Sequence, residues 1–388
     1  MATLLLIVIY IGYVGLGVPD SLLGAAWPAI YEDFQIPTYF ASFITIVTSL
    51  CTFVSSLNSA KLIKRFGTGN LAAVSTTFTA LSLFGISFTG HWVFLVLLAV
   101  PLGLGAGAID SALNGYVALH YNAKQMNFLH CCYGIGVAVS PYLLSIVLSA
   151  VGSWKGGYRA VSFLQMGIAA VLIISLPLWK RIKKSDPTEE EQKLIPLKEI
   201  VKIKGIFPVW TMFLASCSIE ACCTTWGSTY LAEHLKFPVD SAAGTITVYF
   251  VGLALGRIIS GLLSDKFSPK RLMQIGLLVM GCGIVCFLLP LEAVSGTIGL
   301  FLTGLGVGPI YPNLMHITPI IFHRDIAQSI MGTHMAVAFI GVTLSPPFFG
   351  WIANLLGQGV FPIFIGLLLI ALVTAIIKLS SYLKESAN

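Results

Sequence analysis

Residues 103–110 read GLGAGAID, and residues 304–311 read GLGVGPIY, with the small and apolar positions in the same order. The two segments begin 201 positions apart (304 − 103). Two further pairs keep nearly the same spacing: SAKLIKRF (59–66) with SGLLSDKF (260–267), and IGVAVSP (135–141) with IGVTLSP (340–346). Three matches in the same order indicate that the chain contains two copies of one plan.

The composition predicts that both copies lie in a membrane. The 388 residues are 56% hydrophobic and only 10% charged, whereas about 25% of residues are charged in soluble proteins. Apolar runs of about 20 residues recur, and an α-helix needs that length to cross the hydrocarbon core. We predict an all-α polytopic membrane protein with twelve transmembrane helices, at residues 3–31, 38–60, 68–89, 92–119, 125–151, 157–179, 206–232, 239–264, 270–290, 294–320, 327–354 and 358–381.

One long charged stretch, KRIKKSDPTEEEQKLIPLKEIVKIKG, separates six predicted spans from the other six. We therefore expect an N-terminal six-helix bundle at 1–179, a cytoplasmic linker at 180–205 and a C-terminal six-helix bundle at 206–388. Parallel six-helix repeats around a central cavity are the architecture of one large class of transporters. The glycine-rich matches are consistent with it, because small residues allow neighbouring helices to approach closely.

The basic residues predict the orientation of the chain. With both termini cytoplasmic, 18 of the 22 Lys and Arg residues fall on the inner side, the exceptions being Lys155, Arg159, Lys236 and Arg257. This asymmetry follows the positive-inside rule, so the net charge of +6 reflects topology and not binding to nucleic acid. We expect an integral protein of the plasma membrane, the inner membrane in a bacterium, that functions as a monomer in the lipid bilayer. Arg257 lies inside a span and is expected to have a structural pairing role.

Three acidic residues, Asp20, Asp110 and Glu220, lie deep inside predicted spans. Each acid at mid-bilayer costs about 2.5–3.5 kcal/mol on insertion scales, so a passive role is a poor explanation for all three. A carboxylate whose exposure to water alternates can bind and release a proton. We therefore predict that these acids couple transport to a cation, H+ or Na+.

Polar and aromatic residues accompany these acids at helical spacing. Asp110 and Asn114 are separated by four positions and share a helix face, and Asn127, His130 and Tyr133 recur every third position in the next span. Aromatic rings can stack on the C–H faces of a sugar while polar groups bind its hydroxyls. The candidate substrate-binding residues are Asp110, Asn114, Asn127, His130, Tyr133, Trp27, Trp226, Tyr311 and Asn313. Interhelical packing or structural hydrogen bonding is the alternative role for each.

No motif for a metal, a cofactor or a catalytic reaction is present. The eight cysteines lie within predicted spans and show no Cys/His metal spacing. HExxH and GxSxG are absent. We therefore expect no enzyme activity and no cofactor.

The loop from Gly261 through Asp265, Lys266 and Phe267 to Arg271 resembles the signature of the major facilitator superfamily between the second and third helices of each half. The resemblance covers nearly the whole chain. It implies a gating role for Gly261, Asp265, Lys266 and Arg271. The first-half copy is degraded at Ala60 and Lys64, so the resemblance implies an Asp-based latch in the second half only.

Four short motifs resemble the fucose/glucose/galactose symporter branch of this superfamily. They are Pro19-Asp20-Ser-Leu-Leu, Asp110-Ser-Ala-Leu-Asn114, Asn127-Phe-Leu-His130 with Gly134-Ile-Gly136, and Glu220 with Trp226 and Tyr230. In two places the chain departs from the branch: Asp110 replaces a Glu, and His130 replaces a frequent Gln.

The resemblance implies a secondary carrier that moves a monosaccharide or similar small polar solute together with protons, or with sodium, by alternating access. Asp20 would be the leading coupling site and Asp110 the leading substrate site. Two other functions stay open: a proton-coupled efflux carrier for drugs or lipophilic metabolites, and a receptor-like membrane protein that senses a nutrient.

Overall fold

The structure, a computed structural model, describes residues 2–185, 192–236, 239–289 and 292–385. Within these ranges every regular element is a helix. Eleven of the described helical segments are long and apolar enough to cross a membrane, and a shorter apolar helix, Thr247–Leu263, corresponds to the eighth predicted span. The prediction of an all-α polytopic membrane protein is confirmed.

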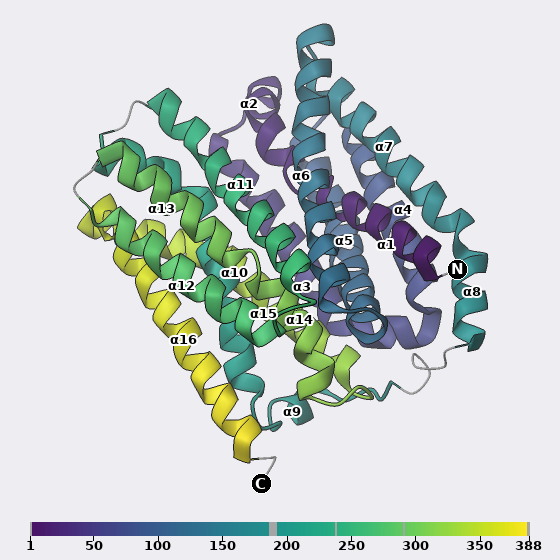
Figure 1. Ribbon diagram of the computed structural model, residues 1–388. Helices are drawn as coiled ribbons and strands as arrows, with labels where there is room; N and C mark the ends of the chain where they lie inside the picture. The colour runs from purple at the N-terminus through teal and green to yellow at the C-terminus, as the bar shows by residue number, and fades with distance from the viewer. Residues whose placement is uncertain (1, 186–191, 237–238, 290–291, 386–388) are drawn as a thin grey trace. The chain divides into compact units, whose positions relative to one another are not determined.

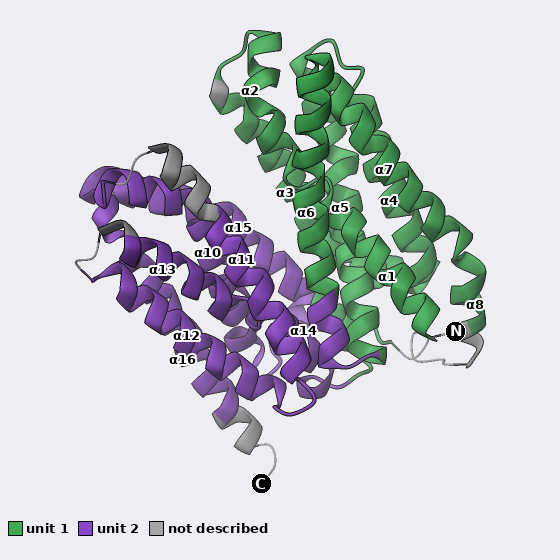
Figure 2. Cartoon of the chain, turned by 45° about the horizontal axis from the view of Figure 1, so that its top comes forward, with its two compact units in different colours: residues 1–120, 129–194, 324–332 green, residues 121–128, 195–323, 333–388 purple. Residues whose placement is uncertain are grey.

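The chain forms two compact units, coloured separately in Figure 2. Unit 1 contains residues 1–120, 129–194 and 324–332, and unit 2 contains residues 121–128, 195–323 and 333–388. The unit boundary therefore crosses two continuous helices, α6 (Ala123–Val151) and α15 (Ala327–Leu356), as well as the segment between the six-span halves. The predicted bundle limits at 179 and 206 stay a prediction.

Each unit is a bundle of long helices (Figure 1). Besides its part of α6, unit 1 contains α1 (Ala2–Gly17), α2 (Leu22–Phe34), α3 (Ala41–Phe66), α4 (Thr68–Ile86), α5 (Trp92–His120), α7 (Trp154–Ile174) and α8 (Leu176–Ser185). Besides most of α15, unit 2 contains α9 (Leu197–Ile200), α10 (Ile206–Thr229), a π-helical turn η3 (Tyr230–His234), α11 (Val239–Leu263), α12 (Pro269–Phe287), α13 (Glu292–Val307), α14 (Ile310–Ile321) and α16 (Phe361–Glu385). Short 3₁₀ turns, η1 (Thr38–Phe40) and η4 (Gln358–Val360), precede α3 and α16.

The glycine-rich repeats make equivalent contacts in the two units. In unit 1, α5 packs against α3 and α4, and in unit 2, α13 packs against α11 and α12. A Cβ atom added at each repeated glycine would collide with a backbone carbonyl oxygen of the neighbouring helix. The matched contacts are Gly103 to Thr48 and Gly304 to Tyr249, Gly105 to Ser75 and Gly306 to Gly276, and Gly107 to Thr52 and Gly308 to Leu253. In each match the two glycines are 201 positions apart, and so are the two residues that they contact. The spacing of the repeat in the sequence is therefore also the spacing of the helix contacts.

Two predicted spans are broken near their middle. In the first span, α1 ends at Gly17 and α2 begins at Leu22, because Pro19 has no N–H for the helical ladder. The turn between them is closed by tighter bonds, from Asp20 N to Gly17 O (3.2 Å) and from Leu22 N to Pro19 O (3.3 Å). In the tenth span, Pro309 precedes α14 in the same way. Both spans were predicted as continuous helices, and the two breaks correct that prediction.

Candidate functional site

Four buried polar side chains from α1, α5 and α6 form one hydrogen-bonded group in unit 1, which we term the Asp110 cluster: Tyr13, Asp110, Asn114 and His130. The Tyr13 hydroxyl donates to Asp110 Oδ1 (2.6 Å), and Asn114 Nδ2 donates to the same oxygen (2.8 Å). Asn114 Nδ2 also donates to the Tyr13 hydroxyl oxygen. His130 Nε2 lies 3.1 Å from Asn114 Oδ1. Because an amide oxygen only accepts, this bond requires the proton of His130 on Nε2.

Burial explains why these groups are bonded to one another. Tyr13, Asp110, Asn114 and His130 are between 0% and 8% exposed, and a buried polar group without a partner is costly. The Tyr13 ring also meets the His130 ring edge-on, with centroids 5.3 Å apart. The shared helix face predicted for Asp110 and Asn114 is confirmed. Tyr13 and His130 extend it to two further helices.

Asp20 lies in the break between α1 and α2, where its side chain is exposed. The Tyr133 hydroxyl donates to Asp20 Oδ2 (2.6 Å), so α6 supplies the partner of this carboxylate. Next to it, Ser21 Oγ donates to the carbonyl of Val137 (2.6 Å) and lies 3.1 Å from Ser140 Oγ. These bonds attach the turn around Asp20 to α6.

The tyrosine partners of Asp20 and Asp110 contact each other through their rings. The rings of Tyr13 and Tyr133, which bond to Asp110 and Asp20 respectively, have centroids 6.5 Å apart. In the described ranges neither acid forms an ion pair with Lys, Arg or His. Unit 1 therefore holds two membrane-embedded acids whose described partners are hydroxyl and amide groups.

The third predicted acid has a different environment. Glu220, on α10 of unit 2, forms an ion pair with Arg257 of α11, with 3.7 Å between Oε2 and Nη2. The Arg257 side chain is 8% exposed and the Glu220 side chain is 30% exposed. The structural pairing expected for Arg257 is therefore found. Glu220 was not predicted as the partner, because the sequence does not show that these parts of α10 and α11 are neighbours.

Several predicted substrate-binding residues have other partners. Asn127 Nδ2 donates to the carbonyl of Ala123 on its own helix (2.8 Å), in a segment that belongs to unit 2. Asn313 Nδ2 donates to Ser260 Oγ (2.8 Å) and to the carbonyl of Pro309 (2.7 Å). The structure therefore does not place Asn127 and Asn313 in the Asp110 cluster.

Three of the predicted aromatic residues, Trp27, Trp226 and Tyr311, pack against other rings or apolar side chains. Trp27 packs against the apolar cluster of unit 1 and lies 6.4 Å from the ring of Tyr31. In unit 2, Trp226 Nε1 donates to the carbonyl of Pro346 (2.9 Å), and Tyr311 meets the ring of Phe213 edge-on at 5.1 Å.

The predicted gating residues lie at the end of α11 and the start of α12. Gly261 is buried, whereas Asp265, Lys266 and Arg271 are exposed. Asp265 forms an ion pair (3.3 Å) with Lys124, which lies in the first turn of α6 within unit 2. The gating function itself stays a prediction.

Comparison with known proteins agrees with the helix arrangement. A family model described as Major Facilitator Superfamily matches residues 9–245 and 224–386. The chain is 25% identical over 390 residues to "Bypass of stop codon protein 6" of Saccharomyces cerevisiae, covering 90% of this chain and 77% of the relative. It is 22% identical over 376 residues to "Glucose/mannose transporter GlcP" of Bacillus subtilis, covering 91% and 90% respectively.

Two solved structures share the fold. The outward conformation of the transporter FucP gives a TM-score of 0.75 at 13% identity, covering 96% of this chain and 97% of that chain. The proton:xylose symporter XylE bound to 6-bromo-6-deoxy-D-glucose gives a TM-score of 0.77 at 12% identity, covering 96% and 94%. At these identities the likeness concerns the arrangement of helices.

Proposed function

The chain belongs to the Major Facilitator Superfamily and is a secondary transporter, not an enzyme, and we propose that it carries a monosaccharide or a similar small polar solute in symport with protons. The observation that carries this proposal is the Asp110 cluster. Its carboxylate, amide, imidazole and phenol groups together offer both donors and acceptors. A sugar hydroxyl requires both, since it donates one hydrogen bond and accepts others.

The two acids of unit 1 have separable roles in this proposal. Asp20 is exposed and has a phenol partner. In this proposal it exchanges a proton with water while Tyr133 holds the carboxyl group in place. Asp110, Asn114 and His130 contact the hydroxyl groups of the solute. The ring contact between Tyr13, which bonds to Asp110, and Tyr133, which bonds to Asp20, links the proton site to the substrate site in this proposal.

The transport cycle follows from alternating exposure. Asp20 takes up a proton from outside, and the solute binds by exchanging hydrogen bonds with the Asp110 cluster. Rocking of the two halves then exposes both ligands to the cytoplasm, where they leave and the carrier resets. Energy for uphill movement comes from the proton gradient. The similarity to a glucose/mannose transporter supports a sugar as the solute.

Uptake of a panel of labelled sugars into proteoliposomes tests the proposal, with pH and sodium gradients imposed separately. We expect a pH gradient, acidic outside, to drive accumulation of at least one sugar. Accumulation under a sodium gradient alone would overturn proton coupling. Expulsion of hydrophobic cations, with no sugar accumulated, would overturn the sugar assignment and favour an efflux carrier.

Substitution of Asp20 tests the division of roles. We expect Asp20→Asn to abolish gradient-driven accumulation while exchange of labelled for unlabelled solute continues, and Asp110→Asn to abolish both. Asp33→Asn is a matched control, because Asp33 lies on α2 and pairs with Lys155 (3.2 Å) away from the cluster. Equal loss of accumulation and exchange in Asp20→Asn would contradict a pure coupling role.

A further inference from the structure

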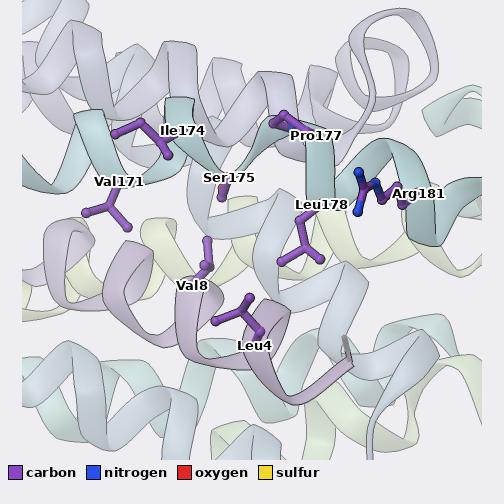
Figure 3. A pocket seen from close by; sticks show the side chains of 8 residues that line it. All are labelled: Leu4, Val8, Val171, Ile174, Ser175, Pro177, Leu178 and Arg181. Carbon is purple, nitrogen blue, oxygen red and sulfur yellow. The ribbon is translucent and has the colours of Figure 1, made fainter.

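A groove in unit 1 lies between the first helix and the end of the sixth predicted span. It has a volume of about 430 Å³ and is lined by Leu4 and Val8 of α1 and by Val171, Ile174, Leu178 and Arg181 of α7 and α8. Figure 3 shows Leu4 and Val8 opposite the row formed by Val171, Ser175 and Leu178, with Arg181 at one end of that row. Its walls are apolar, and Arg181 is its one charged lining residue.

Helical spacing produces the two walls. Leu4 and Val8 are one turn apart on α1, and Val171, Ile174, Leu178 and Arg181 recur every three or four positions, so each set lies along one face. Pro177 breaks the ladder between α7 and α8, since it cannot donate to the carbonyl of Ile173.

The rotation of α8 is fixed by a tryptophan on its opposite face. Trp179 is 8% exposed, packs against Gly69 of α4, and meets the ring of Tyr116 on α5 edge-on at 4.9 Å. With Trp179 held inside unit 1, Leu178 and Arg181 are directed into the groove. The packing of Trp179 therefore fixes the position of the Arg181 cation at the end of the apolar wall.

The groove is open towards the surroundings of the helices. The side chains of Leu4 and Ile174 are 56% and 77% exposed. Both lie on membrane-spanning segments, Thr3–Phe34 and Trp154–Arg181. Exposed apolar side chains on such segments face the hydrocarbon of the bilayer, not water. The groove is therefore next to the acyl chains of the lipids.

The basic residues near the groove indicate which class of lipid it binds. Four of the five residues from 180 to 184, next to the end of the span, are Lys or Arg, and the first acids, Asp186 and Glu189 to Glu191, follow later in the sequence. A cluster of cations directly after a membrane span attracts anionic lipid headgroups. The positive-inside pattern predicts that this end of the span is cytoplasmic.

We propose that this groove binds an anionic phospholipid of the cytoplasmic leaflet. One acyl chain lies between Leu4 and Ile174, and the phosphate is bound by Arg181. The site is independent of the transported solute and of the Asp110 cluster.

Native mass spectrometry of the full-length protein in mild detergent tests this site. The probes are phosphatidylglycerol and phosphatidylcholine with the same acyl chains, and inorganic phosphate alone. We expect the parent protein to retain phosphatidylglycerol in preference to phosphatidylcholine and to retain no phosphate. Arg181→Gln should reduce that preference about fivefold, the effect of about 1 kcal/mol per basic residue near an anionic headgroup. Lys61→Gln removes an exposed cation outside the groove and should leave the preference unchanged.

The apolar wall is tested separately. Ile174→Ser should weaken binding of both lipids by about fourfold or more, the value of one buried methylene group. Ile173→Ser, at a neighbouring exposed position that does not line the groove, should have no such effect. Equal lipid preference in Arg181→Gln and Lys61→Gln would overturn the headgroup assignment. Equal binding by the two Ser variants would overturn the acyl-chain assignment.

Discussion

The ion pair between Glu220 and Arg257 gives a prediction whose size follows from its geometry. With 3.7 Å between the charged atoms, the Coulomb energy is about 4.5 kcal/mol at an effective dielectric constant of about 20. Partial exposure of Glu220 and the desolvation of both charges reduce this value. We expect a coupling energy of about 1–3 kcal/mol in a double-mutant cycle.

The two single substitutions are not equivalent. Glu220→Gln leaves Arg257 charged in a site where 8% of its side chain is exposed, so we expect a loss of about 3–5 kcal/mol in the free energy of unfolding. Arg257→Gln leaves Glu220, whose side chain is 30% exposed, and the loss should be smaller. The double variant Glu220→Gln/Arg257→Gln should be more stable than Glu220→Gln alone, because it removes the buried positive charge as well.

Unfolding in mixed micelles with increasing denaturing detergent, followed by tryptophan fluorescence, measures these differences. The control cycle uses Asp33 and Lys155, an ion pair at 3.2 Å whose side chains are 45% and 33% exposed. Its coupling energy should be below about 1 kcal/mol, because water screens the pair. A coupling for Glu220 and Arg257 no larger than the control would refute the reasoning from burial.

Three further predictions concern other parts of the molecule. Tyr13→Phe removes the hydroxyl that donates to Asp110 and should lower the free energy of unfolding by about 1–3 kcal/mol and weaken solute binding, which denaturant titration and exchange assays measure; wild-type affinity would contradict a substrate role for the cluster. Gly304→Ala places a methyl group against a carbonyl oxygen of α11 and should destabilise unit 2 by about 1–3 kcal/mol in the same titration, and an unchanged midpoint would argue against this close approach. Asp265→Asn removes an exposed ion pair with Lys124 and should change stability by less than about 1 kcal/mol, so a large loss would show that the pair is screened less than its exposure implies.

Local spacing in the sequence predicted those features that a single helix determines. Asp110 and Asn114 are four positions apart, so their contact follows from helix geometry alone. Apolar length predicted the spans for the same reason, because one helix must cross the whole bilayer. The break at Pro19 also had a local signal, a proline within an apolar run, but the run was read as one helix.

Contacts between helices were predictable only where the repeat indicated them. The pairing of Glu220 with Arg257 depends on which faces of α10 and α11 meet, and sequence separation contains no such information. Asn127 has the spacing of a site residue, yet its amide nitrogen donates to the carbonyl of Ala123 on its own helix. The groove at Arg181 was missed because its walls come from the two ends of the first half.

The glycine contacts repeated at an interval of 201 have a consequence for how the chain can change. They involve backbone carbonyl groups, so they constrain the path of the main chain, while the side chains on the neighbouring helices differ between the two halves. At this interval Tyr311 stands where the first half has Asp110, and Arg257 stands where it has Ser56. The two halves thus share the close helix contacts, whereas their polar and charged residues differ. Close helix packing can therefore be kept while the polar residues of one half change, as Asp110 and Tyr311 at matching positions illustrate.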